Sequence, residues 1–154
     1  MIYRNSQEDL LQQGLIKPCP TDWKAIGNLI GRAHTDLKTA ERNMDDDAEC
    51  AYNYAYNAML RSGLALMFSE GFRPEVAKKH LTTVKFASSI LGDKFSEAIN
   101  AYDIMRRKRH RFIYEPEIPC SSEEAHEALE AATKFVNTIR ELIRKKNPQL
   151  QLDF

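Results

Sequence analysis

The chain is 154 residues long, and its 22 basic and 22 acidic side chains give a formal net charge of +0 at pH 7. This balance excludes a global attraction to nucleic acid or to an anionic membrane, so any such role must come from a local cluster. With 43% hydrophobic and 29% charged residues but only 6 Gly and 6 Pro, the composition is typical of one compact helical domain and excludes a disordered chain.

The cysteines and the polar N-terminus predict a cytoplasmic protein without membrane contact. Cys19, Cys50 and Cys120 are odd in number, far apart and outside any CxxC pair, as expected for reduced thiols. No apolar run approaches the roughly 20 residues that a membrane span needs. The first nine residues also lack the apolar core of a signal peptide.

Three segments are expected along the chain: a lead-in at 1–20, a helical bundle at 21–146 and a tail at 147–154. The lead-in contains a short helix over 7–13, which Gly14 ends. Pro18 and Pro20 then mark the break before the bundle.

Within the bundle, apolar residues recur every three or four positions, which is the period of amphipathic helices. Thr21 is the expected N-cap of the first helix. The second helix starts near residue 48 and ends at Gly71. Pro74 is the expected first residue of the third, which carries Val76 on its apolar face and stops at Gly92.

A fourth helix is expected from Asp93 to the residues before Pro116, and a last one from Ser121, which forms a capping box with Glu124, to Asn147. No segment before the tail shows the sustained period-two alternation of a strand. The sequence therefore predicts an all-α, antiparallel up-and-down bundle of four long helices plus a short N-terminal helix.

The most biased stretch is the basic run at the end of the fourth helix. We use this name for its cations, with His110 between the last two: Arg106, Arg107, Lys108, Arg109 and Arg111. Arg106 and Arg109 share one helical face with Tyr102, and Pro116 should leave the run in the last turns and the loop after them. Cations at a helix C-terminus also complement the macrodipole, so a solvated structural role is an alternative.

Enzyme signatures are otherwise missing, because the sequence has no Walker loop, GxGxxG, HExxH or GxSxG. His34, His80 and His126 have no ligand partner at metal spacing, so we expect neither a metal nor a cofactor, and we interpret His80 as a core or boundary histidine. Arginine can hold a phosphate bidentately, and His110 or Tyr114 can position a proton beside it. The basic run is therefore suited to RNA phosphates.

At this point the sequence resembles the HEPN superfamily over about residues 21–145. The resemblance is carried by a Gly-Phe-Arg-Pro turn, the basic run, an SxxE-capped last helix and an Ala- and Tyr-rich second helix (Ala51, Tyr52, Ala55, Tyr56 and Ala58). It implies an all-α bundle that dimerises, and many members are metal-independent ribonucleases, including toxins encoded beside a nucleotidyltransferase-like partner. Arg109 matches the motif arginine and His110 the adjacent polar position, while Tyr114 stands at the place of the catalytic histidine.

The predicted site is thus a basic cleft at a homodimer interface that binds RNA or nucleotide. Arg106, Arg107, Lys108, Arg109 and Arg111 are its binding residues, and Arg109, His110 and Tyr114 are its catalytic candidates. Whether such a site cleaves RNA stays open, because Tyr114 replaces the usual histidine. The alternative is a non-catalytic module that pairs with a nucleotidyltransferase-like or other protein.

The C-terminal tail is a further candidate. Residues 149–154 read Gln-Leu-Gln-Leu-Asp-Phe and resemble the short peptides by which bacterial proteins dock on the replication sliding clamp. The alternative is a tail that packs on the bundle or adds to a sheet edge.

Overall fold

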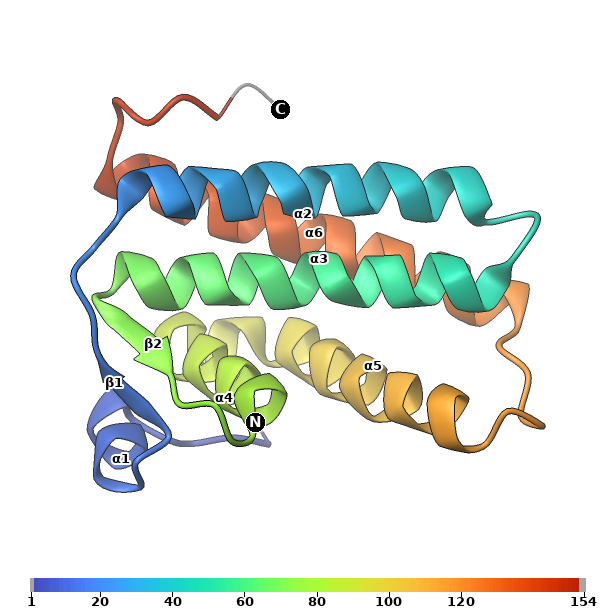
Figure 1. The fold of residues 1–154 in the computed structure, drawn as a ribbon, viewed down its shortest axis with the longest axis horizontal. Coiled ribbons are helices and arrows are strands. Elements are labelled where there is room, and N and C mark those ends of the chain that lie inside the picture. The colour runs from blue at the N-terminus through green and yellow to red at the C-terminus, as the bar shows by residue number, and fades with distance from the viewer. Residues whose placement is uncertain (1, 153–154) are drawn as a thin grey trace.

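The computed structural model describes residues 2–152 and is built mainly from helices (Figure 1). In chain order the elements are α1 (Gln7–Gln12), β1 (Ile16–Pro18), α2 (Trp23–Asn43), α3 (Ala48–Ser69), β2 (Phe72–Pro74), α4 (Lys79–Leu91), the 3-10 helix η1 (Asp93–Phe95), α5 (Ser96–Tyr114) and α6 (Ser122–Lys146).

The helices form the predicted all-α bundle around α3. Helix α2 runs antiparallel to α3, α6 packs against both, and α4 and α5 cover the remaining side of α3 (Figure 1). Consequently α3 is buried on nearly all sides, whereas α2 and α6 bury one apolar stripe each. Four of the helices are long, and α4, with 13 residues, is the shorter fifth. In the part of the chain described, no helix is long and apolar enough to cross a membrane.

Helix boundaries follow the expected signals in most places. Ser121 caps α6 by accepting a hydrogen bond from the backbone of Glu124, and Asp47 caps α3 in the same way. Gly71 and Gly92 follow α3 and α4 with φ angles of 85° and 72°, a region that suits glycine.

Two boundary predictions are wrong. Asp22 rather than Thr21 caps α2, because its carboxylate accepts from the backbone of Ala25. Pro74 is the last residue of β2, and α4 begins five residues later at Lys79. The chain stays extended there because β2 pairs antiparallel with β1 in the register Ile16 to Pro74, Lys17 to Arg73 and Pro18 to Phe72. Val76 therefore lies outside the helix and is 94% exposed.

The lead-in is held against the bundle. Its helix α1 lies where the sequence predicts a short helix, and Leu10 and Ile16 bury their side chains in a small core with Met67 and Phe86. Tyr3 reaches α5, where its hydroxyl donates to Asp103 at 2.9 Å. The division between lead-in and bundle at residue 20 stays a prediction.

The described part of the tail also packs on the bundle. Leu152 is buried, Leu150 contacts the core, and the guanidinium of Arg144 donates to the carbonyl of Leu152. Two residues of the clamp-like peptide are thus used in packing, while Asp153 and Phe154 lie outside the described residues.

Candidate functional site

The basic run lies entirely within α5. The helix continues to Tyr114, and the backbone N–H of Glu115 still donates to the carbonyl of Arg111. The expectation that part of the run occupies the following loop is therefore wrong, because Pro116 disfavours helical geometry only at the residue before it. Each side chain of the run consequently has a fixed position around the helix axis.

Asp103 forms ion pairs with the first two arginines of the run. Its carboxylate is 2% exposed and lies one turn before them on the same helix. Oδ1 accepts from Arg106 Nε at 3.1 Å and from the hydroxyl of Tyr3 at 2.9 Å, and Oδ2 lies 2.6 Å from Arg107 Nη2. Burial alone would raise the pKa of Asp103, but the hydrogen bonds from Tyr3 and Arg106 and the charge of Arg107 outweigh it and hold the pKa below its usual value.

Two further cations of the run have carboxylate partners. Lys108 Nζ lies 3.4 Å from Glu124 at the start of α6, and Arg111 Nε lies 2.9 Å from Glu115. All four groups are substantially solvated, so these pairs are weak and can exchange for other anions.

Arg109 is placed differently. Among residues 2–152 no carboxylate lies within ion-pair distance of it, and its guanidinium carbon lies 5.4 Å from the centre of the Tyr56 ring on α3. A cation over an aromatic face is stabilised without losing its charge. Arg109 therefore presents an unneutralised, positioned guanidinium at a partly exposed site.

The other two catalytic candidates lie close to each other. The rings of His110 and Tyr114, one turn apart, have centres 4.5 Å from each other, and Tyr114 is 70% exposed. Successive helix residues point about 100° apart. His110 therefore leaves α5 in a different direction from Arg109, which packs over Tyr56.

The histidine that the sequence placed in the core or at its boundary, His80, lies close to Tyr56 and Arg109. His80, in the first turn of α4, has its Nδ1 2.6 Å from the hydroxyl oxygen of Tyr56, and the two rings are parallel within 4°. Burial lowers the pKa of His80, and the charges of Arg109, Lys79 and Arg106 lower it further. Burial also raises the pKa of Tyr56, which keeps it a neutral phenol.

The sequence placed His80 in the core or at its boundary but did not identify its neighbours. The pairing with Tyr56 fits a boundary histidine, as expected. Its proximity to Arg109 arises because α4 and α5 both pack against α3, and no sequence spacing reports that contact. Lys78 is the N-cap residue of α4 and makes no side-chain capping hydrogen bond, and Lys79 is the first residue of the helix, so this helix end adds positive potential.

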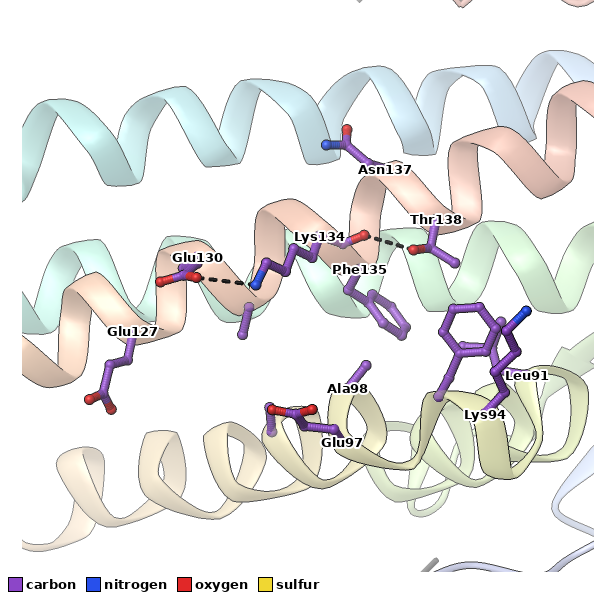
Figure 2. A pocket seen from close by; sticks show the side chains of 13 residues that line it. Leu91, Lys94, Glu97, Ala98, Glu127, Glu130, Lys134, Phe135, Asn137 and Thr138 are labelled. Atoms are coloured by element: carbon purple, nitrogen blue, oxygen red, sulfur yellow. Dashed lines mark hydrogen bonds and ion pairs between the residues drawn. The ribbon is translucent and has the colours of Figure 1, made fainter.

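A separate groove of about 660 Å³ lies between α5 and α6 (Figure 2). Its floor is apolar, with Phe135, Leu91 and Ala98, and its rim carries charges such as Glu127 and Glu130. None of the basic run lines it. Within residues 2–152, no three His, Cys, Asp or Glu side chains come together as metal ligands.

Comparison with known protein families identifies the family of the chain. The model of the HEPN domain matches residues 26–142, from α2 to α6. The chain belongs to the HEPN domain family. HEPN membership supports a function related to nucleotides or RNA, and it accounts for the helical bundle. No curated protein and no solved structure gives a significant match to this HEPN chain.

Proposed function

We propose that this HEPN protein binds RNA or nucleotide phosphate through the basic face of α5, with Arg109 as the central contact and Arg106, Arg107, Lys108 and Arg111 around it. One observation supports this most strongly: Arg109 is held over Tyr56 with no carboxylate near it among the described residues. A guanidinium in that state can form two parallel hydrogen bonds with a phosphate.

A homodimer would complete this site. Ile113 and Tyr114 expose 55% and 70% of their surface at the C-terminal end of α5, beside the basic run. Apolar side chains grouped on one helix are typical of an interaction surface. A second copy packed there would bring two basic faces to one cleft and place His110 and Tyr114 of one subunit near Arg109 of the other.

The finer proposal is metal-independent RNA cleavage in that cleft, of the kind found in HEPN toxins. Arg109 would hold the scissile phosphate, and His110 or Tyr114 would position the proton. In this arrangement the second subunit supplies the exposed pair of His110 and Tyr114.

The decisive experiment measures binding and cleavage of single-stranded RNA in EDTA while the salt concentration is raised. Arg109→Ala should weaken binding and lower the slope of log K against log salt by about 0.7, as expected for one lost phosphate contact. Arg42→Ala, an exposed arginine on α2, is the matched control and should change neither. Equal effects of the two variants would contradict the proposal.

Cleavage is tested in the same assay. Loss of product in Arg109→Ala and in Tyr114→Phe, with wild-type folding by circular dichroism, would establish a metal-independent ribonuclease. Binding without cleavage would leave a binding protein, and the absence of salt-sensitive binding would overturn both RNA proposals.

A second candidate function rests on the α5 and α6 groove. Its apolar floor and charged rim are typical of a surface that receives a protein segment, which supports a module that pairs with a nucleotidyltransferase-like partner. Ala131→Arg at the groove should abolish co-purification with a nucleotidyltransferase-like protein encoded by an adjacent gene. RNA binding should remain unchanged. If RNA binding falls equally, the groove and the basic face are not independent sites.

A further inference from the structure

Three side chains from three different helices, Tyr56, His80 and Arg109, meet at the basic run. Of these, only Arg109 matches the sequence motif of the family. Tyr56 of α3 contacts both of the others: its hydroxyl oxygen lies 2.6 Å from His80 Nδ1 of α4, and its ring lies under the guanidinium of Arg109 of α5. Tyr56 is completely buried, whereas His80 and Arg109 are partly exposed. The buried phenol therefore fixes two groups that solvent and solutes can reach.

Among the described residues, the charged groups that shift the pKa of His80 are cations. Arg109 and Arg106 approach it from α5, Lys79 lies beside it on α4, and the neutral Tyr56 approaches it from α3. Asp103 is occupied by Tyr3, Arg106 and Arg107. A group surrounded in this way is costly to protonate in the free protein, but an anion placed among the same cations would remove that cost.

We propose that Arg109 and His80, aligned by Tyr56, form a proton-linked phosphate site, in which the phosphate binds both side chains and His80 takes up a proton from solvent as it binds. This inference rests on the proposed function, because it takes Arg109 as the phosphate contact, and it adds a second contact and a pH dependence. The phosphate belongs either to an RNA backbone or to a free nucleotide.

The hydrogen bond to Tyr56 suits both protonation states. While His80 is neutral, the phenol can donate to Nδ1, and once His80 is protonated, Nδ1–H can donate to the phenol oxygen. In either state Nε2 carries a hydrogen that can be donated to a phosphate oxygen. Tyr56 thus holds the ring orientation constant while the charge changes.

The linkage has a definite sign. Burial and the neighbouring cations lower the pKa of His80 in the free protein, so it is neutral at pH 7. A bound phosphate raises that pKa, so binding consumes a proton and tightens as the pH falls through the interval between the two values. Without His80 this part of the pH dependence disappears, while the salt dependence due to Arg109 remains.

The test measures the Kd of a fluorescently labelled oligouridylate by anisotropy from pH 8 to pH 5.5 at constant ionic strength. We expect the wild type to bind roughly fivefold more tightly at the acidic end. His80→Gln should flatten the profile. His126→Gln, an exposed histidine at the start of α6, should retain it. A His80→Gln profile that equals the wild type would overturn the inference.

Imidazole NMR provides a readout that does not depend on affinity. A saturating oligouridylate should move the His80 pKa upward from its lowered value in the free protein. Tyr56→Phe keeps the ring under Arg109 but removes the hydroxyl, so it should change the His80 titration. An unchanged His80 pKa on saturation would refute the proton-linked site.

The outcomes separate this inference from the proposed function and identify the ligand. Binding that is salt-sensitive but equally pH-dependent in His80→Gln overturns the inference alone, whereas no oligouridylate binding at any pH overturns the proposed function together with it. Repeating the NMR titration with uridine monophosphate distinguishes the two phosphate sources, because a backbone site should respond to the oligonucleotide at far lower concentration.

Discussion

Two buried aspartates, Asp36 in α2 and Asp103 in α5, have opposite electrostatic outcomes. They are 1% and 2% exposed. Asp36 contacts the guanidinium of Arg61, whose Nε lies 2.7 Å from Oδ2. Asp103 instead meets three partners, the hydroxyl of Tyr3 and the guanidinium groups of Arg106 and Arg107. Both side chains are almost inaccessible to solvent, and Asp103 has more donors around it than Asp36 has.

The pKa directions follow from this difference. Burial raises the pKa of Asp36, and the charges of Arg61 and Arg32 offset only part of the effect. At Asp103 burial also raises the pKa, but the hydrogen bonds and charges of its partners outweigh this effect, so the pKa is lowered. A buried carboxylate with several donors is a strong anchor for cations. In α5 that anchor pairs with Arg106 and Arg107, whereas Arg109, one turn further on, has no carboxylate within ion-pair distance among residues 2–152.

The largest effect should come from removing the better-satisfied anchor. Asp103→Ala leaves Tyr3 without its acceptor and two arginines without their counter-charge, so we expect the free energy of unfolding to fall by about 3 kcal/mol. Urea unfolding at pH 7 measures it. Asp93→Ala, an exposed aspartate in η1, is the control and should change stability by less than about 0.5 kcal/mol. Similar losses in both variants would show that Asp103 is not an anchor.

The pH dependence of stability should have opposite signs at the two aspartates. The lowered pKa of Asp103 means that its stabilisation is present above the unfolded value and is lost as the pH falls through the folded value. The raised pKa of Asp36 means that stability declines as the pH rises from the unfolded value through the folded one.

Conservative replacements make this measurable. Asp103→Asn should remove an acid-induced loss of stability below about pH 4, and Asp36→Asn should remove a loss that develops above about pH 4. Unfolding free energies from pH 2.5 to pH 7 test both variants. Parallel curves for wild type and either variant would contradict the corresponding pKa direction.

A smaller effect isolates one donor. Tyr3→Phe removes only the hydroxyl that donates to Asp103, so stability should fall by about 1 kcal/mol and the acid transition assigned to Asp103 should move to higher pH. Tyr114→Phe is the matched control, because Tyr114 is 70% exposed. If both phenols are equally dispensable, the Tyr3 hydrogen bond contributes nothing to the anchor.

Local signals predicted much of this architecture. The apolar period located every long helix, and Gly71, Gly92 and Ser121 marked their ends, because helix geometry and capping depend on residues a few positions apart. The start of α4 was missed because Pro74 stays in a strand whose partner, β1, lies more than fifty residues earlier. The preference of proline for the first position of a helix is therefore overridden at Pro74 by the strand pairing with Ile16.

The contacts of the site likewise divide into those between residues close in sequence and those between distant segments. Asp103 stands three and four positions before Arg106 and Arg107, so those ion pairs were available from the sequence as i,i+3 and i,i+4 contacts. The hydrogen bond from Tyr3 and the meeting of Tyr56, His80 and Arg109 join distant segments. Only the packing of α3, α4 and α5 brings Tyr56, His80 and Arg109 together. For this reason the sequence named Arg109 as a candidate but did not predict its neighbours.

The smallest change in stability is expected for Arg107→Ala, and this variant also tests how Asp103 affects RNA binding. Arg107 is 62% exposed and shares Asp103 with Arg106, so Arg107→Ala should lower the free energy of unfolding by less than about 1 kcal/mol. Because its charge is already partly neutralised, its loss should also reduce the salt slope of RNA binding by less than half the reduction seen in Arg109→Ala. Anisotropy titrations of the two variants at several salt concentrations make the measurement. Equal slopes would mean that Asp103 does not neutralise Arg107 in the bound state, and that the run acts as a uniform basic patch without Arg109 as its centre.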